Sequence, residues 1–146
     1  MDQCRMRFRP SIRAALLGLI LLTGPSCGEP AMNPSTDQAR AALEAALNAW
    51  REGKRPGNIE GTDPPVQAVD NDWTNGRKLI AYEVLSEKPS ESDKRFAVKL
   101  RYKAPAPEIE AVYVVLGVSP IAVFREEDYE RTLNMDNNPT PRKKRS

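Results

Sequence analysis

The 146-residue chain contains no histidine, so it lacks the commonest general base and the commonest transition-metal ligand. Its only two cysteines, Cys4 and Cys27, both lie near the N-terminus. Thiol catalysis and a Ser-His-Asp triad are therefore excluded from the rest of the chain. A zinc or iron site there would need carboxylate ligands alone, which is an unfavourable donor set. We expect no cofactor, no metal and no catalytic residue, and we favour a non-enzymatic role.

The N-terminal region also lacks a hydrophobic run long enough to cross a bilayer. Residues 14–22 are apolar, whereas a membrane-spanning helix takes roughly 20 such residues. Four arginines precede this run, and Gly24, Pro25 and Ser26 follow it. A basic start, a short apolar segment and then small residues are typical of a secretory signal peptide. We therefore predict that residues 1–26 are a signal peptide.

The segment that ends at Cys27 resembles the lipobox of bacterial lipoproteins. In that pattern a leucine usually lies three positions before the cysteine, where this chain has Gly24 followed by Pro25. The resemblance implies a lipid on Cys27. Because Gly28 is not an inner-membrane retention aspartate, it also implies an outer-membrane lipoprotein that faces the periplasm or the surface. Cleavage by an ordinary signal peptidase, after Gly28 or Ala31, is the alternative.

Little net charge remains once the leader is set aside. The whole chain has 22 basic and 20 acidic residues, and the leader holds four of the basic residues and one of the acidic ones. The remainder therefore has 18 basic and 19 acidic residues, a net charge of about −1. Without a basic stripe, nucleic-acid binding is disfavoured. The expected partners are the membrane, through the lipid on Cys27, and an envelope protein.

The mature chain is long enough for one small domain. We expect a tether at 27–35, a single α+β domain at 36–133 and a disordered basic tail at 134–146. The domain should open with a helix, because Ser35 and Gln38 have the spacing of a capping box and Gly53 supplies a stop. The apolar residues that recur at helical spacing are Ala39, Ala42, Leu43, Ala46, Leu47 and Trp50.

Residues 54–76 are rich in proline and glycine and are predicted to be irregular, with Trp73 packed into the core beneath them. Alternating patterns then predict four strands, at 78–86, 95–103, 108–117 and 120–125. Short connections favour an antiparallel meander. One or two helical turns are expected between Glu126 and Leu133.

A helix packed on a four-stranded antiparallel meander, over residues 36–126, resembles the cystatin-like and NTF2-like α+β architectures. The runs Ala-Trp-Arg-Glu-Gly-Lys-Arg-Pro (49–56) and Arg-Glu-Glu-Asp-Tyr-Glu-Arg (125–131) resemble uncharacterised small bacterial lipoproteins. That family has no known activity, so the resemblance implies no site residues.

Three groups of residues are candidate sites. In an NTF2-like cone, Trp73, Tyr82, Tyr113 and Asp70 would line a pocket, with Asp70 and one of the two tyrosines as the only acid–base pair. Turn-forming aspartates are the simpler reading. The acids Glu126, Glu127, Asp128 and Glu130 lack the loop glycine of a calcium site and fit a helix start better. The cations Arg95, Lys99, Arg101 and Lys103 would bind an anionic polymer, lipopolysaccharide or an acidic partner. The simpler reading is a solvated strand face whose charges protect the sheet edge.

These observations favour an envelope-anchored, non-enzymatic binding or assembly-accessory domain. One alternative is an NTF2-like pocket domain that binds or converts a small ligand. The other is a purely structural surface lipoprotein.

Overall fold

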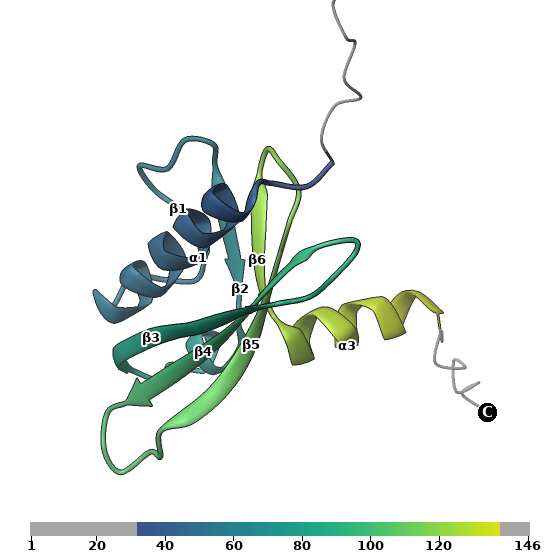
Figure 1. The fold of residues 1–146 in the computed structure, drawn as a ribbon. Helices are drawn as coiled ribbons and strands as arrows, with labels where there is room; N and C mark the ends of the chain where they lie inside the picture. The colour runs from purple at the N-terminus through teal and green to yellow at the C-terminus, as the bar shows by residue number, and fades with distance from the viewer. Residues whose placement is uncertain (1–31, 138–146) are drawn as a thin grey trace, which may run out of the picture.

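The computed structural model describes residues 32–137, so the predicted signal peptide, Cys27 and the tail from residue 138 lie outside the described residues. The described chain is an α+β domain with three helices and one six-stranded mixed sheet (Figure 1). In chain order the elements are α1 (Thr36–Arg51), β1 (Gly57–Ile59), β2 (Val66–Val69), α2 (Asn71–Thr74), β3 (Leu79–Lys88), β4 (Lys94–Tyr102), β5 (Ile109–Leu116), β6 (Ile121–Arg125) and α3 (Glu126–Asn137).

Helix α1 forms where the sequence predicts it. The Ser35 hydroxyl accepts a hydrogen bond from the Gln38 amide at 3.2 Å, and the Gln38 side chain accepts one from the Ser35 amide at 3.1 Å. This reciprocal capping box satisfies two amides that the first turn leaves unpaired. All six residues of the predicted apolar stripe are buried. Both the helix and its role as the cover of the sheet are confirmed.

The four predicted strands are confirmed as β3 to β6, each within two residues of its expected bounds. The predicted four-stranded antiparallel meander is only part of the sheet, whose order is β1-β2-β6-β5-β4-β3. Strand β2 pairs with β6 in parallel, and every other neighbouring pair is antiparallel.

The prediction that residues 54–76 are irregular was wrong, because this segment holds β1, β2 and α2. In β2, Val66 and Ala68 are buried and alternate with exposed Gln67 and Val69. Four residues are too few for the alternation to stand out after two prolines. The partner strand β6 lies more than fifty residues later in the chain, so no local pattern shows the pairing.

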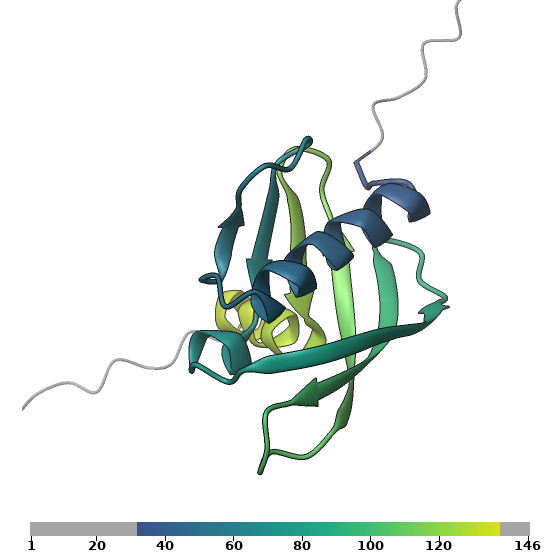
Figure 2. The same cartoon turned by 90° about the vertical axis from the view of Figure 1, so that its left-hand side faces the viewer.

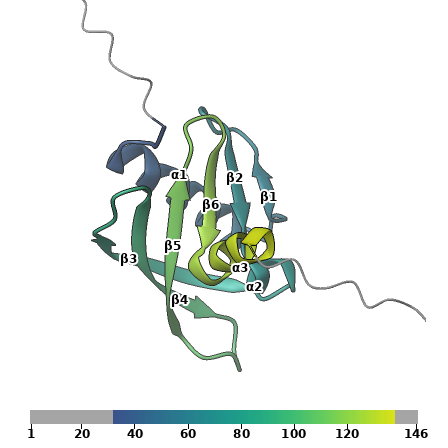
Figure 3. The ribbon, with the colours of Figure 1, turned by 90° about the vertical axis from the view of Figure 1, so that its right-hand side faces the viewer.

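The two faces of the sheet are covered by different helices. Helix α1 lies across one face (Figure 2), and α3 lies on the other, over β5 and β6 (Figure 3). The main core fills the space under α1 and includes the alternating residues predicted for β4, which are Phe96, Val98, Leu100 and Tyr102. On the α3 side, the Tyr129 ring packs 5.6 Å from the Phe124 ring.

Helix α3 is longer than expected. It runs to Asn137, four residues into the segment that was predicted to be a disordered tail. Within the part of the chain that the structure describes, no helix combines the length and apolarity needed to cross a membrane.

Candidate functional site

Three of the four predicted pocket residues come together at one end of the core. Asp70 is the N-cap of α2, and its Oδ1 accepts a hydrogen bond from the Trp73 amide at 3.0 Å. Its Oδ2 accepts a hydrogen bond from the Tyr113 hydroxyl at 2.7 Å. Tyr82 lies apart on β3, where its hydroxyl is 3.0 Å from the Asn48 side-chain oxygen.

The Asp70–Tyr113 pair faces the packed interior. The space around it between α1 and the sheet amounts to about 10 Å³, whereas ligand pockets occupy roughly 300–1,000 Å³. Burial raises the pKa of Asp70, against the lowering effect of its hydrogen bonds and of Arg125. Burial also raises the pKa of Tyr113 well above its usual value, and the neighbouring carboxylate adds to this effect. Here the pair ties α2 to the sheet.

An open groove of about 660 Å³ lies outside this core, where α1 ends. Its walls come from the segments 50–56 and 73–80. Five basic side chains line it, against the single acid Glu52. The five are Arg51, Lys54, Arg55, Arg77 and Lys78. We call this feature the cationic groove.

The two walls of the cationic groove share a sequence pattern. Residues 50–55 read Trp-Arg-Glu-Gly-Lys-Arg, and residues 73–78 read Trp-Thr-Asn-Gly-Arg-Lys. Both are Trp-x-x-Gly followed by two basic residues, and they contain the only two tryptophans of the chain. We call 50–55 the first half of the groove and 73–78 the second half. This repeat is visible in the sequence, but we did not predict a site from it.

The first half turns the chain away from the end of α1. Gly53 has a φ of 78° and donates its amide to the Trp50 carbonyl at 2.9 Å. The next amide, from Lys54, donates to the Ala49 carbonyl at 3.0 Å. These two bonds close a Schellman motif, which needs the positive φ that glycine adopts without strain.

The second half repeats the same turn at the end of α2. Gly76 has a φ of 81° and donates to the Trp73 carbonyl at 2.9 Å. The Arg77 amide donates to the Asp72 carbonyl at 3.0 Å. In both halves, therefore, the tryptophan lies on the last helical turn and the first basic residue follows the glycine.

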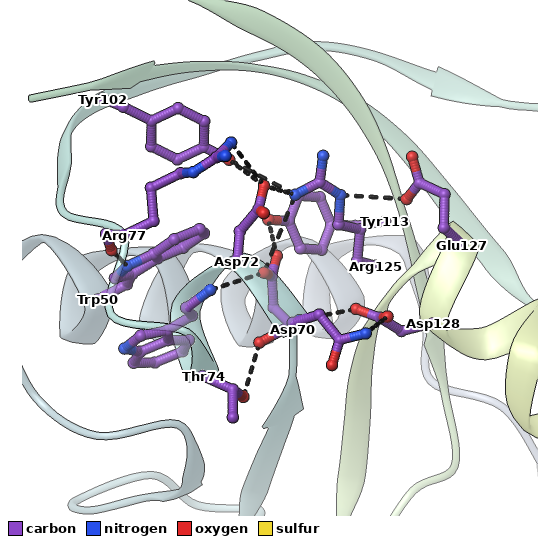
Figure 4. A network of polar contacts seen from close by, with 12 residues as sticks. Trp50, Asp70, Asp72, Thr74, Arg77, Tyr102, Tyr113, Arg125, Glu127 and Asp128 are labelled. Carbon is purple, nitrogen blue, oxygen red and sulfur yellow. Dashed lines mark hydrogen bonds and ion pairs between the residues drawn. The ribbon is translucent and has the colours of Figure 1, made fainter. Parts of the chain in front are cut away.

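The two tryptophans join the two halves by ring stacking and by reciprocal hydrogen bonds. The indole rings stack with centroids 5.5 Å apart and an interplanar angle of 10°. Trp50 Nε1 donates to the Arg77 carbonyl at 2.7 Å, and Trp73 Nε1 donates to the Lys54 carbonyl at 2.8 Å. Each indole thus holds the first basic residue of the opposite half (Figure 4 shows the Trp50 side). The groove is therefore built into the fold.

The Asp72 carboxylate fixes the position of the second half by accepting three hydrogen bonds. Its Oδ2 accepts hydrogen bonds from Arg77 Nη1 at 3.2 Å, from the Tyr102 hydroxyl at 3.1 Å and from Arg125 (Figure 4). The Arg77 guanidinium also lies over the Tyr102 ring, 5.0 Å from its centroid. Burial, reinforced by Asp72, raises the pKa of Tyr102 to about 12, so this hydroxyl remains a donor at neutral pH.

Two residues beyond the groove fix the position of α2. The Arg125 guanidinium, mostly buried, pairs with Asp72 and lies 4.0 Å from Asp70. Asp128, at the start of α3, accepts the Asn71 amide at 2.8 Å. Helix α2 is only four residues long, so these contacts from β6 and α3 supply the rigidity that its own hydrogen bonds cannot.

Several residues of the other predicted clusters are already engaged by partners within the domain. Among the four acids near residue 126, Glu126 pairs with Arg95, and Asp128 holds α2. No group of metal-ligating side chains is present in the described residues 32–137. On β4, Lys99 pairs with Glu108 at 2.7 Å, whereas Arg101 makes no ion pair within the described residues.

A second hollow, of about 220 Å³, lies between α1 and residues 62–64. Its α1 side is mainly alanine, and Asp63 is its only charged lining residue. It offers few groups that could orient a ligand, so the cationic groove is the better candidate site.

No family model, no curated protein and no solved structure matches this chain. The resemblances to small lipoproteins and to cystatin-like and NTF2-like folds therefore remain predictions from the sequence.

Proposed function

We propose that this chain is an exported, non-enzymatic binding domain, anchored in the outer membrane by a lipid on Cys27, and that it binds its ligand in the cationic groove. The observation that carries the proposal is the concentration of five basic side chains and one acid around an open groove whose shape is fixed by the paired tryptophans. Gathering like charges on a small domain is unfavourable unless an anion neutralises them.

The groove suits binding better than catalysis. Arg55 and Lys78 are exposed and make no ion pair within residues 32–137, so both are available to a ligand. The lining acid Glu52 already pairs with Lys54 at 2.9 Å. The only buried acid–tyrosine pair among the residues that the structure describes, Asp70 with Tyr113, faces the filled core. This packing argues against the alternative of an NTF2-like pocket enzyme.

The position of the groove also fits an anchored receptor. The predicted tether enters the domain at the N-terminus of α1, and the groove lies at its C-terminus. A 16-residue helix is about 24 Å long, so the groove is separated from the tether by most of the domain. An anchored domain would thus present the groove away from its own membrane, toward the periplasm or the surface.

Site-specific cross-linking in intact envelopes tests whether the groove is occupied. Ile80 at the groove and Val118 in the β5–β6 turn are 46% and 45% exposed, so Ile80→Cys and Val118→Cys are matched positions. Each variant is labelled with a short thiol-reactive photo-cross-linker and illuminated, and adducts are read by intact mass. We expect an adduct from Ile80→Cys alone. Equal yields at both positions, or none at either, would favour the purely structural lipoprotein.

The predicted export and lipid anchoring can be tested separately. The intact mass of the membrane-extracted protein should show a chain that starts at Cys27 with a lipid-sized excess, and Cys27→Ser should lose that excess. A soluble chain that still begins at Met1 would refute the export signal. A chain that begins after Gly28 or Ala31 would instead indicate ordinary signal-peptidase cleavage.

A further inference from the structure

We infer that the ligand of the cationic groove carries two phosphate groups, one for each half of the groove. This inference rests on the proposed function and adds the ligand class. Its basis is the repetition of one structural unit: two Schellman turns, joined by reciprocal indole hydrogen bonds, each deliver a Lys/Arg pair to the same opening.

Each half has the chemistry of a phosphate subsite. The first half offers Lys54 and Arg55, and the second half offers Arg77 and Lys78. A guanidinium matches two phosphate oxygens at once, and an ammonium adds a compact charge with three donors. A phosphate group presents three acceptor oxygens, which is enough to engage both cations of one half.

The charge of each half also fits a phosphate. In the first half Glu52 pairs with Lys54, and in the second half Asp72 is shared between Arg77 and Arg125. At least one positive charge per half therefore remains, and Arg51, which also lines the groove, adds another. A single carboxylate would leave most of this charge unmatched. Two phosphates, each carrying between one and two negative charges, balance it.

The second half is already arranged for binding. Arg77 is fixed by Asp72 and by the Tyr102 ring, and its backbone carbonyl is fixed by Trp50. Its side chain nevertheless remains 42% exposed, and Arg77 is among the residues that line the groove. A donor that is held in place before binding loses less side-chain entropy when the ligand arrives. The second half should therefore bind the first phosphate.

Titration calorimetry on the full chain carrying Cys27→Ser tests the inference in solution. The probes are inorganic pyrophosphate, inorganic phosphate, and vesicles of phosphatidylcholine with and without cardiolipin, whose headgroup carries two phosphates. We expect pyrophosphate to bind at least about tenfold more tightly than phosphate, because only pyrophosphate contacts both halves. Binding to cardiolipin vesicles as well would identify a lipid headgroup as the source, and binding to pyrophosphate alone would identify a free ligand.

Matched charge variants assign the binding to the groove. Arg55→Gln with Lys78→Gln removes one exposed cation from each half, and we expect pyrophosphate affinity to fall at least about tenfold. Lys88→Gln with Arg101→Gln removes the same charge from exposed positions on β3 and β4 that make no ion pair within residues 32–137, and should leave the affinity unchanged. Equal losses in both double variants would mean nonspecific attraction and would overturn the inference.

The outcomes separate this inference from the proposed function. If neither pyrophosphate nor cardiolipin vesicles bind, but Ile80→Cys still gives an envelope adduct, the groove is a binding site and the ligand class is wrong. If the adduct is also absent, both proposals fall.

Discussion

The two halves of the cationic groove have the same local structure and different surroundings. Both close a Schellman turn around a glycine and pair their tryptophans reciprocally. In the first half, Lys54 pairs with Glu52, and both side chains are more than half exposed. In the second half, Asp72 joins Arg77 to the mostly buried Arg125. A repeated sequence pattern thus fixes the shape of the turn, while the neighbouring elements determine how firmly it is held.

Removing either tryptophan should cause the largest loss of stability, and the loss should be equal for the two halves. Trp50→Ala and Trp73→Ala each remove a buried ring and a reciprocal hydrogen bond, so we expect each to lower the free energy of unfolding by about 3–5 kcal/mol. Because the rings stack, the double variant should lose less than the sum of the two. Urea denaturation measures all three, and strict additivity would show that the halves are independent.

The ion pairs that hold the two halves should differ strongly in their contribution to the free energy of unfolding. Arg125→Met removes the cation that pairs with the half-buried Asp72 and lies 4.0 Å from the buried Asp70, and we expect a loss of about 3 kcal/mol. The equivalent change in the first half is Lys54→Met, which breaks an exposed pair and should not change stability measurably. Thermal unfolding of the two variants side by side is the measurement. Similar losses would contradict the contrast drawn between the halves.

Replacing the glycine of either Schellman turn should cost the same stability in the two halves. A Cβ added at Gly53 or at Gly76 meets no atom within 4 Å, so the cost of alanine is only that of the positive φ. We expect Gly53→Ala and Gly76→Ala each to cost about 1–2 kcal/mol. Gly117→Ala is the contrasting control, because its Cβ would lie 2.8 Å from the Pro120 carbonyl oxygen and should cost more. Clearly unequal costs at residues 53 and 76 would contradict the structural equivalence of the turns.

The smallest effect concerns pH, and its sign should differ between Asp70, the N-cap of α2 just before the second half, and Glu52 in the first half. Burial raises the pKa of Asp70 above its ordinary value of 3.8, so from that value upward the folded state binds more protons than the unfolded state. Stability should therefore fall as the pH rises through the folded pKa of Asp70, relative to Asp70→Asn. Chemical denaturation across the acid range measures this difference. Parallel curves for the two proteins would refute it.

Glu52 in the first half supplies the opposite case. The hydrogen bond and the charge of Lys54 lower the pKa of Glu52 below its ordinary value of 4.5. Its contribution is thus present above that value and is lost as the pH falls through its folded pKa. Glu52→Gln should remove this loss, which we expect to be slight because the pair is exposed.

Local patterns in the sequence were enough to predict α1 and strands β3 to β6. The capping box of Ser35 and Gln38 and the alternation from Phe96 to Tyr102 are signals contained within a few residues. Strands β1 and β2 were missed because they are three and four residues long, because β2 depends on pairing with the distant β6, and because β1 in turn pairs with β2. The burial of Trp73 was predicted correctly from its place beneath a long connection.

The candidate site was less accessible to prediction. The Trp-x-x-Gly-basic-basic repeat can be read from the sequence, but nothing in it shows that the two copies face each other. That arrangement requires α2 to dock beside the end of α1, and the docking depends on Arg125 and Asp128 from the far end of the chain. The sequence suggested Asp70 with either Tyr82 or Tyr113, and only the fold selects Tyr113.

The two indole N–H signals of the chain test the central claim most directly. Trp50 and Trp73 are its only tryptophans, and each indole N–H donates to a backbone carbonyl of a groove wall. In a proton–nitrogen NMR titration with pyrophosphate, the account predicts that both indole signals shift together and saturate at one ligand per chain. Indole signals that stay fixed while amides elsewhere shift would place the ligand outside the groove and contradict the account.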